Sequence, residues 1–305
     1  MLHSARLRYL DAIVRHGSIR AAAGELNVAS SAVNRQLLAL EERIGAPLFE
    51  RLPRGLKLTA VGEIVIEHVR ATLKDEARVM ARISALRGSQ RGAVTIAVTP
   101  GLADGPMPEI ISQFIGARPS TKVGLSAIRT DQIASAVVNG DVDLGLGYYM
   151  LPNPALQSLM TLHTEFGVLV APNHPLAGRA QVRFSHLLEH KLVLTEPGSS
   201  LRQTIDRALL QRGITLRPDV ETNSIETLKR LVAGGGWATL LNPFDASIEC
   251  RSGRLVFKRL EGGKLSGQLL CLVARAGASA NPLVNLFVEE LRTALPLSAA
   301  FMDAA

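Results

Sequence analysis

Residues 18–59, SIRAAAGELNVASSAVNRQLLALEERIGAPLFERLPRGLKLT, decide the fold of the first part of this chain. Residues 19–26 predict a short helix, because Ser18 is a typical N-cap and the alanines that follow permit close helix packing. Asn27 and Val28 are expected to form the next turn. A longer helix and a basic hairpin follow, so the order is helix, turn, helix, hairpin.

The second helix of this stretch has two faces. Its apolar residues follow each other at spacings of four, three and four, which predicts one inward-facing stripe. They are Val33, Leu37, Leu40 and Ile44. The opposite face carries Ser31, Asn34, Arg35 and Leu38, and it is polar and cationic near its start. A helix whose first half enters the major groove of DNA has this character.

The hairpin is rich in cations. Arg51, Arg54 and Lys57 surround the turn at residues 53–55, and three cations on a small hairpin suit contact with DNA phosphates. Helix pairs with surface arginines also occur in proteins that bind no DNA. The complete order, followed by a long helix, favours a winged helix-turn-helix domain over that alternative.

A long helix is predicted over residues 60–86, which contain no proline and no glycine after Gly62, with Thr59 as its N-cap. Its apolar residues keep a helical spacing. They include Ile64, Val65, Val69, Leu73, Ala77, Met80 and Ile83. Such a stripe needs a partner, and we expect the same helix of a second chain to supply it. The alternative is a helix that packs on its own domain.

Charge is distributed unevenly along the 305 residues, whose net charge is +7. Residues 1–91 hold 15 basic and 9 acidic residues, a surplus of six, and the rest hold 19 and 18, a surplus of one. A nucleic-acid-binding part joined to a nearly neutral part has this distribution. The hydrophobic content of 47% excludes disorder as the main state.

The first twenty residues contain no apolar core of a signal peptide, and no run of 18 apolar residues is present. We therefore expect a cytoplasmic protein with no membrane partner. The two cysteines, Cys250 and Cys271, are expected to be buried free thiols and not zinc ligands.

After a polar hinge at residues 87–92, the pattern changes to alternating strands and helices. Residues 94–98 form an apolar run typical of a buried strand, and residues 110–115 belong to a predicted helix. The alternation continues to a last helix at about residues 282–293. It predicts an α/β fold with a mostly parallel sheet.

The segments SIRAAAGELNVASSAVNRQLLALEERIGAPLFER and RGLKLTAVGE resemble the DNA-binding half of a LysR-type transcriptional regulator, and weaker similarity continues to about Leu295. The resemblance implies a winged helix-turn-helix domain at 1–59, a linker and dimerisation helix at 60–87, and an effector-binding domain at 92–305. That domain is expected to be similar to periplasmic binding proteins. Its lobe one would span about 92–164 plus 268–305 and its lobe two about 165–267, with crossings near Glu165 and Gly267.

The predicted recognition helix departs from the family pattern. Where the family begins this helix with serine and then glutamine, the chain has Ala29 and Ser30, and Asn34 replaces the usual serine before the arginine. Ser30 is still able to cap the helix, but the operator sequence does not follow from the resemblance. The predicted DNA contacts are Ser30, Ser31, Asn34, Arg35, Gln36, Arg51, Arg54 and Lys57.

The effector site is predicted at the carboxyl ends of the strands, where helix N-termini present free N–H groups to an anion. Hydroxyls recur in the strand-to-helix loops at 99–101, 129–131 and 196–200. Each hydroxyl alone has an alternative role as a helix cap, but their recurrence favours a small carboxylate effector, with Arg129 as ion partner. The predicted effector-binding residues are Thr99, Pro100, Gly101, Arg129, Thr130, Tyr148, Ser199, Ser200, Asn223 and Phe244.

Other classes of function compete with this interpretation. A solute-binding protein would have no DNA role, and the basic first part argues against it. The H-x-x-E-H pattern of zinc enzymes is present from His186 to His190, but no third ligand is evident. Gly262-Gly263-Lys264 lacks the spacing of a phosphate loop.

The sequence therefore predicts a DNA-binding transcriptional regulator that responds to a small effector, and not an enzyme, with no cofactor and no metal. The expected partners are double-stranded DNA, a small carboxylate effector, further copies of the chain in a homodimer or homotetramer, and RNA polymerase if the protein is an activator.

Overall fold

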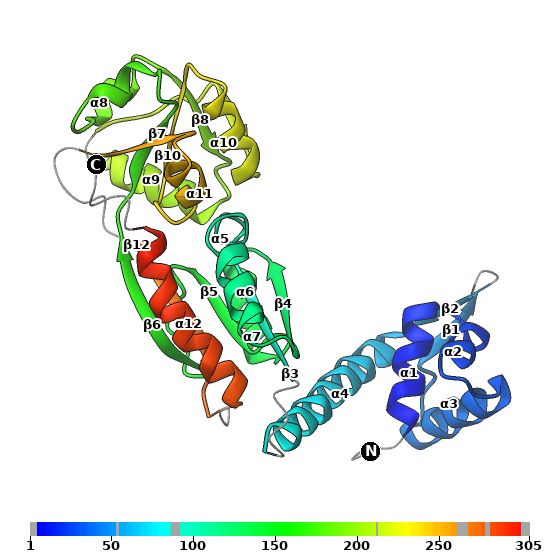
Figure 1. The fold of residues 1–305 in the computed structure, drawn as a ribbon. Coiled ribbons are helices and arrows are strands. Elements are labelled where there is room, and N and C mark those ends of the chain that lie inside the picture. Colours follow the sequence, from blue (N-terminus) through cyan, green and yellow to red (C-terminus); the bar gives the residue numbers. More distant parts are fainter. Residues whose placement is uncertain are drawn as a thin grey trace. The chain divides into compact units, whose positions relative to one another are not determined.

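The structure is a computed structural model that describes residues 5–52, 55–86, 92–211, 213–260, 268–277 and 281–299. The chain divides into two compact units, residues 1–87 and residues 88–305. The first unit is mainly helical and the second combines sheets with helices (Figure 1).

Three helices and a hairpin begin the first unit. The helices are α1 (Ala5–His16), α2 (Ile19–Glu25) and α3 (Ser30–Ile44). The predicted cap of α2 is confirmed, because the Ser18 side chain accepts a hydrogen bond from the Ala21 N–H. The N-cap of α3 is Ala29, whose side chain makes no hydrogen bond. The prediction that Ser30 caps this helix is therefore wrong.

The core of the first unit lies between these helices. Its buried side chains include Leu10, Ile13, Ala22, Val33, Leu37 and Leu40. Ile44, predicted on the same stripe, is 37% exposed. It lies in the last turn of α3, next to Gly45, whose φ of 78° ends the helix. The inward stripe of α3 therefore stops one turn earlier than its spacing predicts.

The hairpin consists of β1 (Phe49–Leu52) and β2 (Gly55–Leu58), which pair antiparallel. The Leu56 N–H donates a 2.9 Å hydrogen bond to the Gly17 carbonyl, which attaches β2 to the turn between α1 and α2. Gly55 has a φ of 130°, and a Cβ here would lie 2.7 Å from the same carbonyl. Both the backbone conformation and the close approach therefore require glycine.

The long helix α4 (Ala60–Leu86) has the predicted cap, since the Thr59 hydroxyl accepts a 3.0 Å hydrogen bond from the Gly62 N–H. The predicted apolar stripe divides between two faces. The residues that pack on the core of the first unit are Val61, Val65, Ile66, Val69 and Leu73. Ile64 and Met80, by contrast, are 71% and 46% exposed. The alternative role, packing on its own domain, thus applies to the first half of the helix.

Lobe one of the second unit contains a sheet in the order β4-β3-β5-β12-β6. Its strands are β3 (Gly92–Val98), β4 (Thr121–Ala127), β5 (Leu144–Tyr148), β6 (Leu156–Thr164) and β12 (Gln268–Arg275). Its helices are α5 (Pro100–Asp104), α6 (Met107–Gly116), α7 (Thr130–Val138) and α12 (Pro282–Ser298). The Phe114 and Phe287 rings join α6 to α12 with centroids 4.8 Å apart. α7 packs closely over Gly145 and Gly147, where a side chain would meet Ile133.

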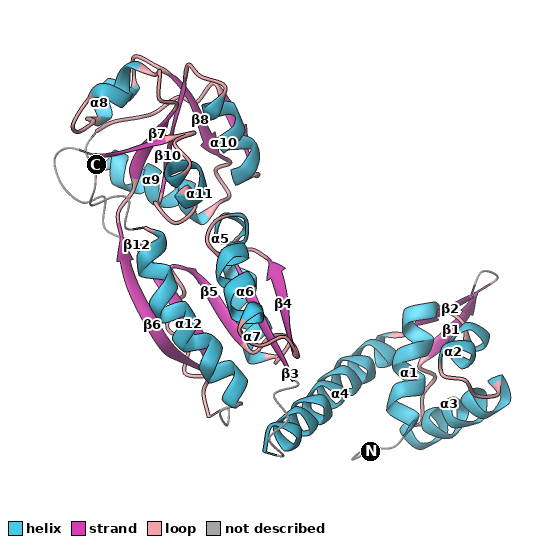
Figure 2. Ribbon diagram, viewed as in Figure 1, coloured by secondary structure: helices cyan, strands magenta, loops and turns pink. Residues whose placement is uncertain are grey.

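Lobe two contains a sheet in the order β11-β7-β10-β8-β9, with helices beside its strands (Figure 2). Its strands are β7 (Gly167–Val170), β8 (Lys191–Thr195), β9 (Val220–Thr222), β10 (Trp237–Leu241) and β11 (Val256–Arg259). Its helices are η1 (Pro175–Gly178), α8 (Phe184–Leu187), α9 (Ser200–Leu210), α10 (Ile225–Ala233) and α11 (Ser247–Arg251). Buried aliphatic residues of β7, β8 and β10 form the centre of its core.

The sheets differ from the prediction in their strand directions. β3, β4 and β5 are parallel, as are β8, β9 and β10, but β12 and β7 each pair antiparallel with two neighbours. Both sheets are therefore mixed and not mostly parallel. The antiparallel strands β6 and β11 were not expected from the sequence, and β6 is followed directly by β7 with no helix between them. The chain passes from lobe one to lobe two between Thr164 and Gly167.

Several predicted features lie outside the described residues. These are most of the hinge at 87–92, the crossing near Gly267, and Gly262-Gly263-Lys264.

Both cysteines are free and partly buried. Burial raises the pKa of the Cys250 thiol to about 12 and that of Cys271 above its usual value. Neither thiol is therefore a reactive thiolate near neutral pH.

Among the helices in the described ranges, none combines the length and the apolar character needed to cross a membrane.

Candidate DNA-binding surface and effector pocket

The outward face of α3 is polar and accessible. Ser30, Ser31 and Arg35 are exposed and Asn34 is half-buried, while Val33 between them is completely buried. In the described part of the chain, the side chains of Ser31, Asn34 and Arg35 make no hydrogen bond and no ion pair. Three predicted contact residues thus keep their hydrogen-bonding groups free for an external partner.

Gln36 differs from these residues. Its side-chain oxygen accepts a 2.6 Å hydrogen bond from Arg6 Nε of α1. The structure therefore places Gln36 between two helices and not on the outward face. The reason is helical geometry, because Gln36 lies three residues after Val33 and four before Leu40, so it borders the buried side of α3.

The hairpin presents one described cation. Lys57 is exposed on β2 and lies opposite Glu50 of β1 in the strand register. Arg54 and the side chain of Arg51 lie outside the described residues.

A cavity of about 910 Å³ lies in the second unit, and residues of both lobes line it. Nine of the ten predicted effector-binding residues belong to its lining. They are Thr99, Pro100, Gly101, Arg129, Thr130, Tyr148, Ser199, Ser200 and Asn223. The strand-to-helix loops chosen for their hydroxyls therefore surround one pocket.

Phe244 is the exception. Its side chain lies in the hydrophobic core of lobe one, together with Leu102 and Met107, although the residue follows β10 of lobe two. It does not line the cavity. We therefore correct its predicted role from pocket wall to a contact that joins the two lobes. An isolated aromatic residue in a loop gives no sequence signal for such packing.

Three helices begin at the cavity wall. α7 begins after Arg129, α9 after Ser199 and α10 after Ser224, and residues of each first turn or cap line the pocket. The first N–H groups of a helix and its dipole favour a negatively charged ligand group. The Ser199 hydroxyl already accepts a hydrogen bond from the Arg202 N–H and donates one to Thr195. It therefore acts as a helix cap in this state.

The charged side chains of the lining are mostly acidic. Arg129 forms a 3.2 Å ion pair with Asp131 on the surface, so these two charges compensate each other. The other charged residues of the lining are Glu196 and Asp245. Neither has an ion-pair partner within 4 Å in the described part of the chain. The pocket thus has a surplus of carboxyl groups, which the sequence alone did not indicate.

A buried hydrogen-bond network lies at this pocket. The Tyr148 hydroxyl donates to Asn242 Oδ1 at 2.7 Å, and Asn242 Nδ2 donates to Asp245 Oδ2 at 2.6 Å. Burial raises the pKa of Asp245 to about 7, against the lowering effect of the Asn242 hydrogen bond and the positive charge of Lys229. Burial and the charge of Asp245 also raise the pKa of Tyr148 well above its usual value.

Sequence reasoning found Tyr148 but missed Asn242 and Asp245. Both follow β10 and meet Tyr148 at the end of β5 only after the lobes pack together. The one available signal was the presence of two polar residues, Asn242 and Asp245, just after the apolar residues of β10.

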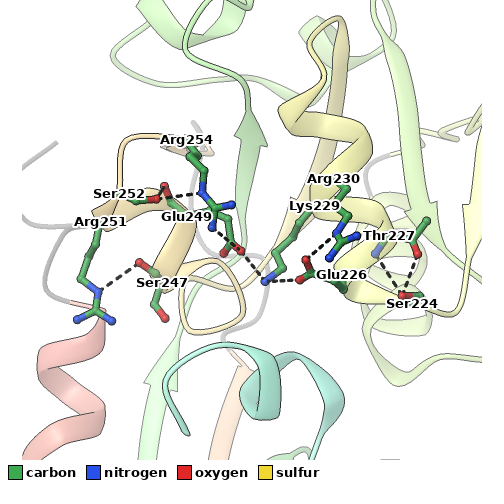
Figure 3. A network of polar contacts seen from close by, with 10 residues as sticks. All are labelled: Ser224, Glu226, Thr227, Lys229, Arg230, Ser247, Glu249, Arg251, Ser252 and Arg254. Carbon is green, nitrogen blue, oxygen red and sulfur yellow. Dashed lines mark hydrogen bonds and ion pairs between the residues drawn. The ribbon is translucent and has the colours of Figure 1, made fainter. Parts of the chain in front are cut away.

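A network of charged residues surrounds Lys229 (Figure 3), whose positive charge also acts on Asp245. Lys229 of α10 is 2% exposed, and its ammonium lies 2.9 Å from Glu249 of α11 and 3.2 Å from Glu226. Arg254 lies 3.7 Å from the same Glu249. A buried lysine requires such partners because desolvation of an isolated ammonium is costly.

The H-x-x-E-H pattern does not form a metal site in this structure. α8 ends at Leu187, so His186 and His190 do not share a helix. The His186 ring accepts a hydrogen bond from the Arg183 N–H, and the His190 ring stacks near His174 with centroids 4.7 Å apart. Within the described residues, no group of three or more His, Cys, Asp or Glu side chains is arranged to bind a metal.

Comparisons with known proteins agree with this architecture. Residues 4–63 match the bacterial regulatory helix-turn-helix protein family, lysR type, and residues 87–296 match the LysR substrate binding domain. The chain belongs to the LysR family. The family of DNA-binding transcriptional regulators named at the sequence level is thereby confirmed, and the protein is a regulator and not an enzyme.

Similar proteins cover nearly the whole chain. The HTH-type transcriptional regulator CbbR of Rhodospirillum rubrum is 30% identical over 292 residues, which is 96% of each chain. The RuBisCO operon transcriptional regulator of Allochromatium vinosum is 28% identical over 284 residues, 93% of each chain. Full-length CbnR, solved with its target DNA, has a TM-score of 0.71 and 21% identity, and covers 95% of this chain and 98% of that chain. At 21% identity, the similarity to CbnR shows a shared fold alone.

Proposed function

We propose that this LysR-family regulator contacts operator DNA through the outward face of α3 and binds a small carboxylate effector in the pocket between its lobes. The observation that carries the DNA part is the exposed group of Ser31, Asn34 and Arg35 on a helix whose opposite face is buried. Arg and Asn side chains make bidentate contacts with guanine and adenine edges. The wing cation Lys57 contacts phosphate.

The protein acts as an oligomer in this proposal. Ile64 and Met80 of α4 remain exposed after the first half of the helix has packed on its own unit. An exposed apolar face of a long helix is stabilised when a second copy covers it. A homodimer or homotetramer presents two or more α3 helices to half-sites of the operator. The regulator acts on cytoplasmic DNA, and as an activator it also contacts RNA polymerase.

The effector is anionic because three helices of at least nine residues begin at the cavity, namely α7, α9 and α10. The N–H groups of their first turns and their dipoles favour a carboxylate there. The lobes are already joined by Tyr148 and Asn242, and by a 2.6 Å ion pair between Arg251 of α11 and Glu109 of α6. An effector that binds one lobe arrangement more tightly shifts the population toward it and changes how DNA is bound.

One pair of measurements tests both parts. Fluorescence anisotropy with the DNA upstream of its own gene should give binding that weakens steeply with salt. Thermal shift with small carboxylates should identify compounds that raise the Tm. DNA binding without salt dependence contradicts the DNA part, and the absence of any stabilising carboxylate contradicts the effector part.

A further inference from the structure

Two buried polar groups in the lining of the effector pocket are available to a ligand. Gln268 Oε1 and Thr99 Oγ1 are buried and have no hydrogen-bond partner in the described part of the chain. The two residues are 1% and 9% exposed, and both line the pocket. Buried polar groups are normally paired, so two unpaired ones in one pocket indicate that a ligand supplies the missing bonds.

These groups lie around the buried network. Leu270 of β12 pairs with Tyr148 of β5, so Gln268, two residues earlier on the same face of the sheet, is a diagonal neighbour of Tyr148. A Cβ on Gly101 would collide with the carboxyl group of Asp245, which places that group against the loop that contains Thr99. Thr99, Gln268 and Asp245 therefore surround one part of the pocket.

All three groups accept hydrogen bonds. Within the described part of the chain, Asp245 Oδ1 has only the long 3.4 Å contact with the Tyr148 hydroxyl, so it retains acceptor capacity. Among the described residues none forms a hydrogen bond with the Gln268 amide, so this group is able to rotate its oxygen toward the cavity. Glu196 adds a second carboxylate to the lining, and it has no ion-pair partner among the residues that the structure describes. When Asp245 and Glu196 are ionised, an anionic group is repelled here, whereas a cationic group with several N–H donors is attracted.

We propose that the effector is a zwitterion whose ammonium group binds among Asp245, Gln268 and Thr99, with Glu196 as a further attracting charge, while its carboxylate lies at the N-termini of α7 and α9. The inference rests on the proposed function, because it retains the carboxylate effector and adds the second charged group. The chemical class is therefore an amino acid or a related amino carboxylate.

Binding of such a ligand depends on pH in a characteristic direction. The groups facing Asp245 are Tyr148, Asn242, Gly101 with the nearby Asp104, and the charge of Lys229. Since the pKa of Asp245 is about 7, more of it is ionised at pH 8 than at pH 6. An ammonium ligand then binds more tightly at pH 8, whereas a plain carboxylate binds less tightly.

The test uses the full-length protein and three sets of ligands, and the members of each of the first two sets differ only in the substituent at carbon 2. The sets are alanine, lactate and propionate, then glutamate, 2-hydroxyglutarate and glutarate, and finally propylamine and putrescine without carboxylates. Thermal shift and calorimetry at pH 6 and pH 8 measure each ligand. We expect an amino acid to bind about tenfold or more tightly than its hydroxy and unsubstituted counterparts, with affinity that increases from pH 6 to pH 8.

Variants locate the ammonium site. Asp245→Asn and Glu196→Gln should each reduce the preference for the amino compound, and Asp245→Asn should remove its pH dependence. Glu189→Gln, an exposed substitution in lobe two outside the lining, is the control. Gln268→Leu removes an unpaired buried oxygen, so it should raise the Tm of the unliganded protein by about 2–4 °C and still lose the preference. A lower Tm in Gln268→Leu would assign this side chain a structural role.

The outcomes separate the two proposals. If propionate or glutarate binds as tightly as its amino counterpart, the zwitterion inference is overturned and the carboxylate effector stands. If the amines bind as tightly as the amino acids, the carboxylate is contradicted and the cation site stands. If no compound in any set raises the Tm, both are overturned.

Discussion

Tyr148, at the end of β5 in lobe one, donates a buried 2.7 Å hydrogen bond to Asn242, which follows β10 in lobe two. The bond joins the lobes at the wall of the effector pocket. Tyr148→Phe removes the donor and keeps the ring, so we expect the free energy of unfolding to fall by about 1 kcal/mol. Chemical denaturation measures this change. Tyr9→Phe, on α1, is the control, and equal stability of both variants would show that the interlobe bond contributes nothing.

Because the folded protein retains the proton of Asp245, the free energy of unfolding should decrease as the pH rises. Burial raises the pKa of this carboxyl from its ordinary 3.8 to about 7 in the folded protein. Between these values the unfolded chain has lost its proton and the folded chain retains it, so rising pH favours unfolding. Relative to Asp245→Asn, the parent should lose roughly 1.4 kcal/mol per unit of pKa difference. Denaturation from pH 4 to pH 8 should show this loss, which levels off above about pH 7.

A curve for the parent that runs parallel to that of Asp245→Asn over the whole range would refute this assignment. Asn242 and Tyr148 remain in place in the variant, so a difference between the curves reports the carboxyl group itself.

Loss of the buried ion pair between Lys229 and Glu249 should lower the free energy of unfolding more than loss of the exposed pair between Arg230 and Glu226. Lys229→Met leaves Glu249 buried without its ammonium partner, and breaking a buried pair costs about 3–5 kcal/mol. Arg230→Met, one residue further on the same helix, removes only an exposed pair with Glu226 and should cost about 0.5 kcal/mol or less. Urea denaturation of the two variants compares them. Similar costs for both would contradict the role of burial.

A feature of the fold could be predicted from the sequence when it depends on residues that are close together in the chain. The caps of α2 and α4, formed by Ser18 and Thr59, follow from short-range chemistry and were predicted correctly. The inward-facing stripe of α3 was predicted from spacing, but spacing did not show that Gln36 bonds Arg6 or that Ile44 lies beyond the core. Those details depend on where neighbouring helices end.

The effector pocket likewise combines residues that the local sequence predicts with residues that only long-range packing brings in. Loops with hydroxyls before helices are recognisable in the sequence, and they line the cavity. Asp245 and Gln268 are far from these loops along the chain, and only the pairing of β12 with β5 and the packing of the lobes bring them there. Phe244 was misplaced for the same reason, since its side chain crosses into the core of the other lobe.

The exposed lysine of the hairpin should contribute to the salt dependence of DNA binding. Lys57→Ala removes one exposed cation of the hairpin, so it should weaken binding to specific and non-specific DNA alike. The slope of log K against log salt should decrease by about one. Lys122→Ala, an exposed lysine of lobe one, is the matched control. An unchanged slope in Lys57→Ala would mean that this lysine does not contact phosphate.

The most direct test concerns the outward face of α3. Arg35→Ala should keep the thermal unfolding of the parent but weaken binding to the operator by about 1–3 kcal/mol, with a smaller effect on non-specific DNA. Arg43→Ala, at the exposed end of the same helix, should leave operator binding unchanged. Fluorescence anisotropy at fixed salt measures all three proteins on both DNAs. An Arg35→Ala variant that binds the operator as tightly as the parent would contradict the claim that α3 recognises DNA.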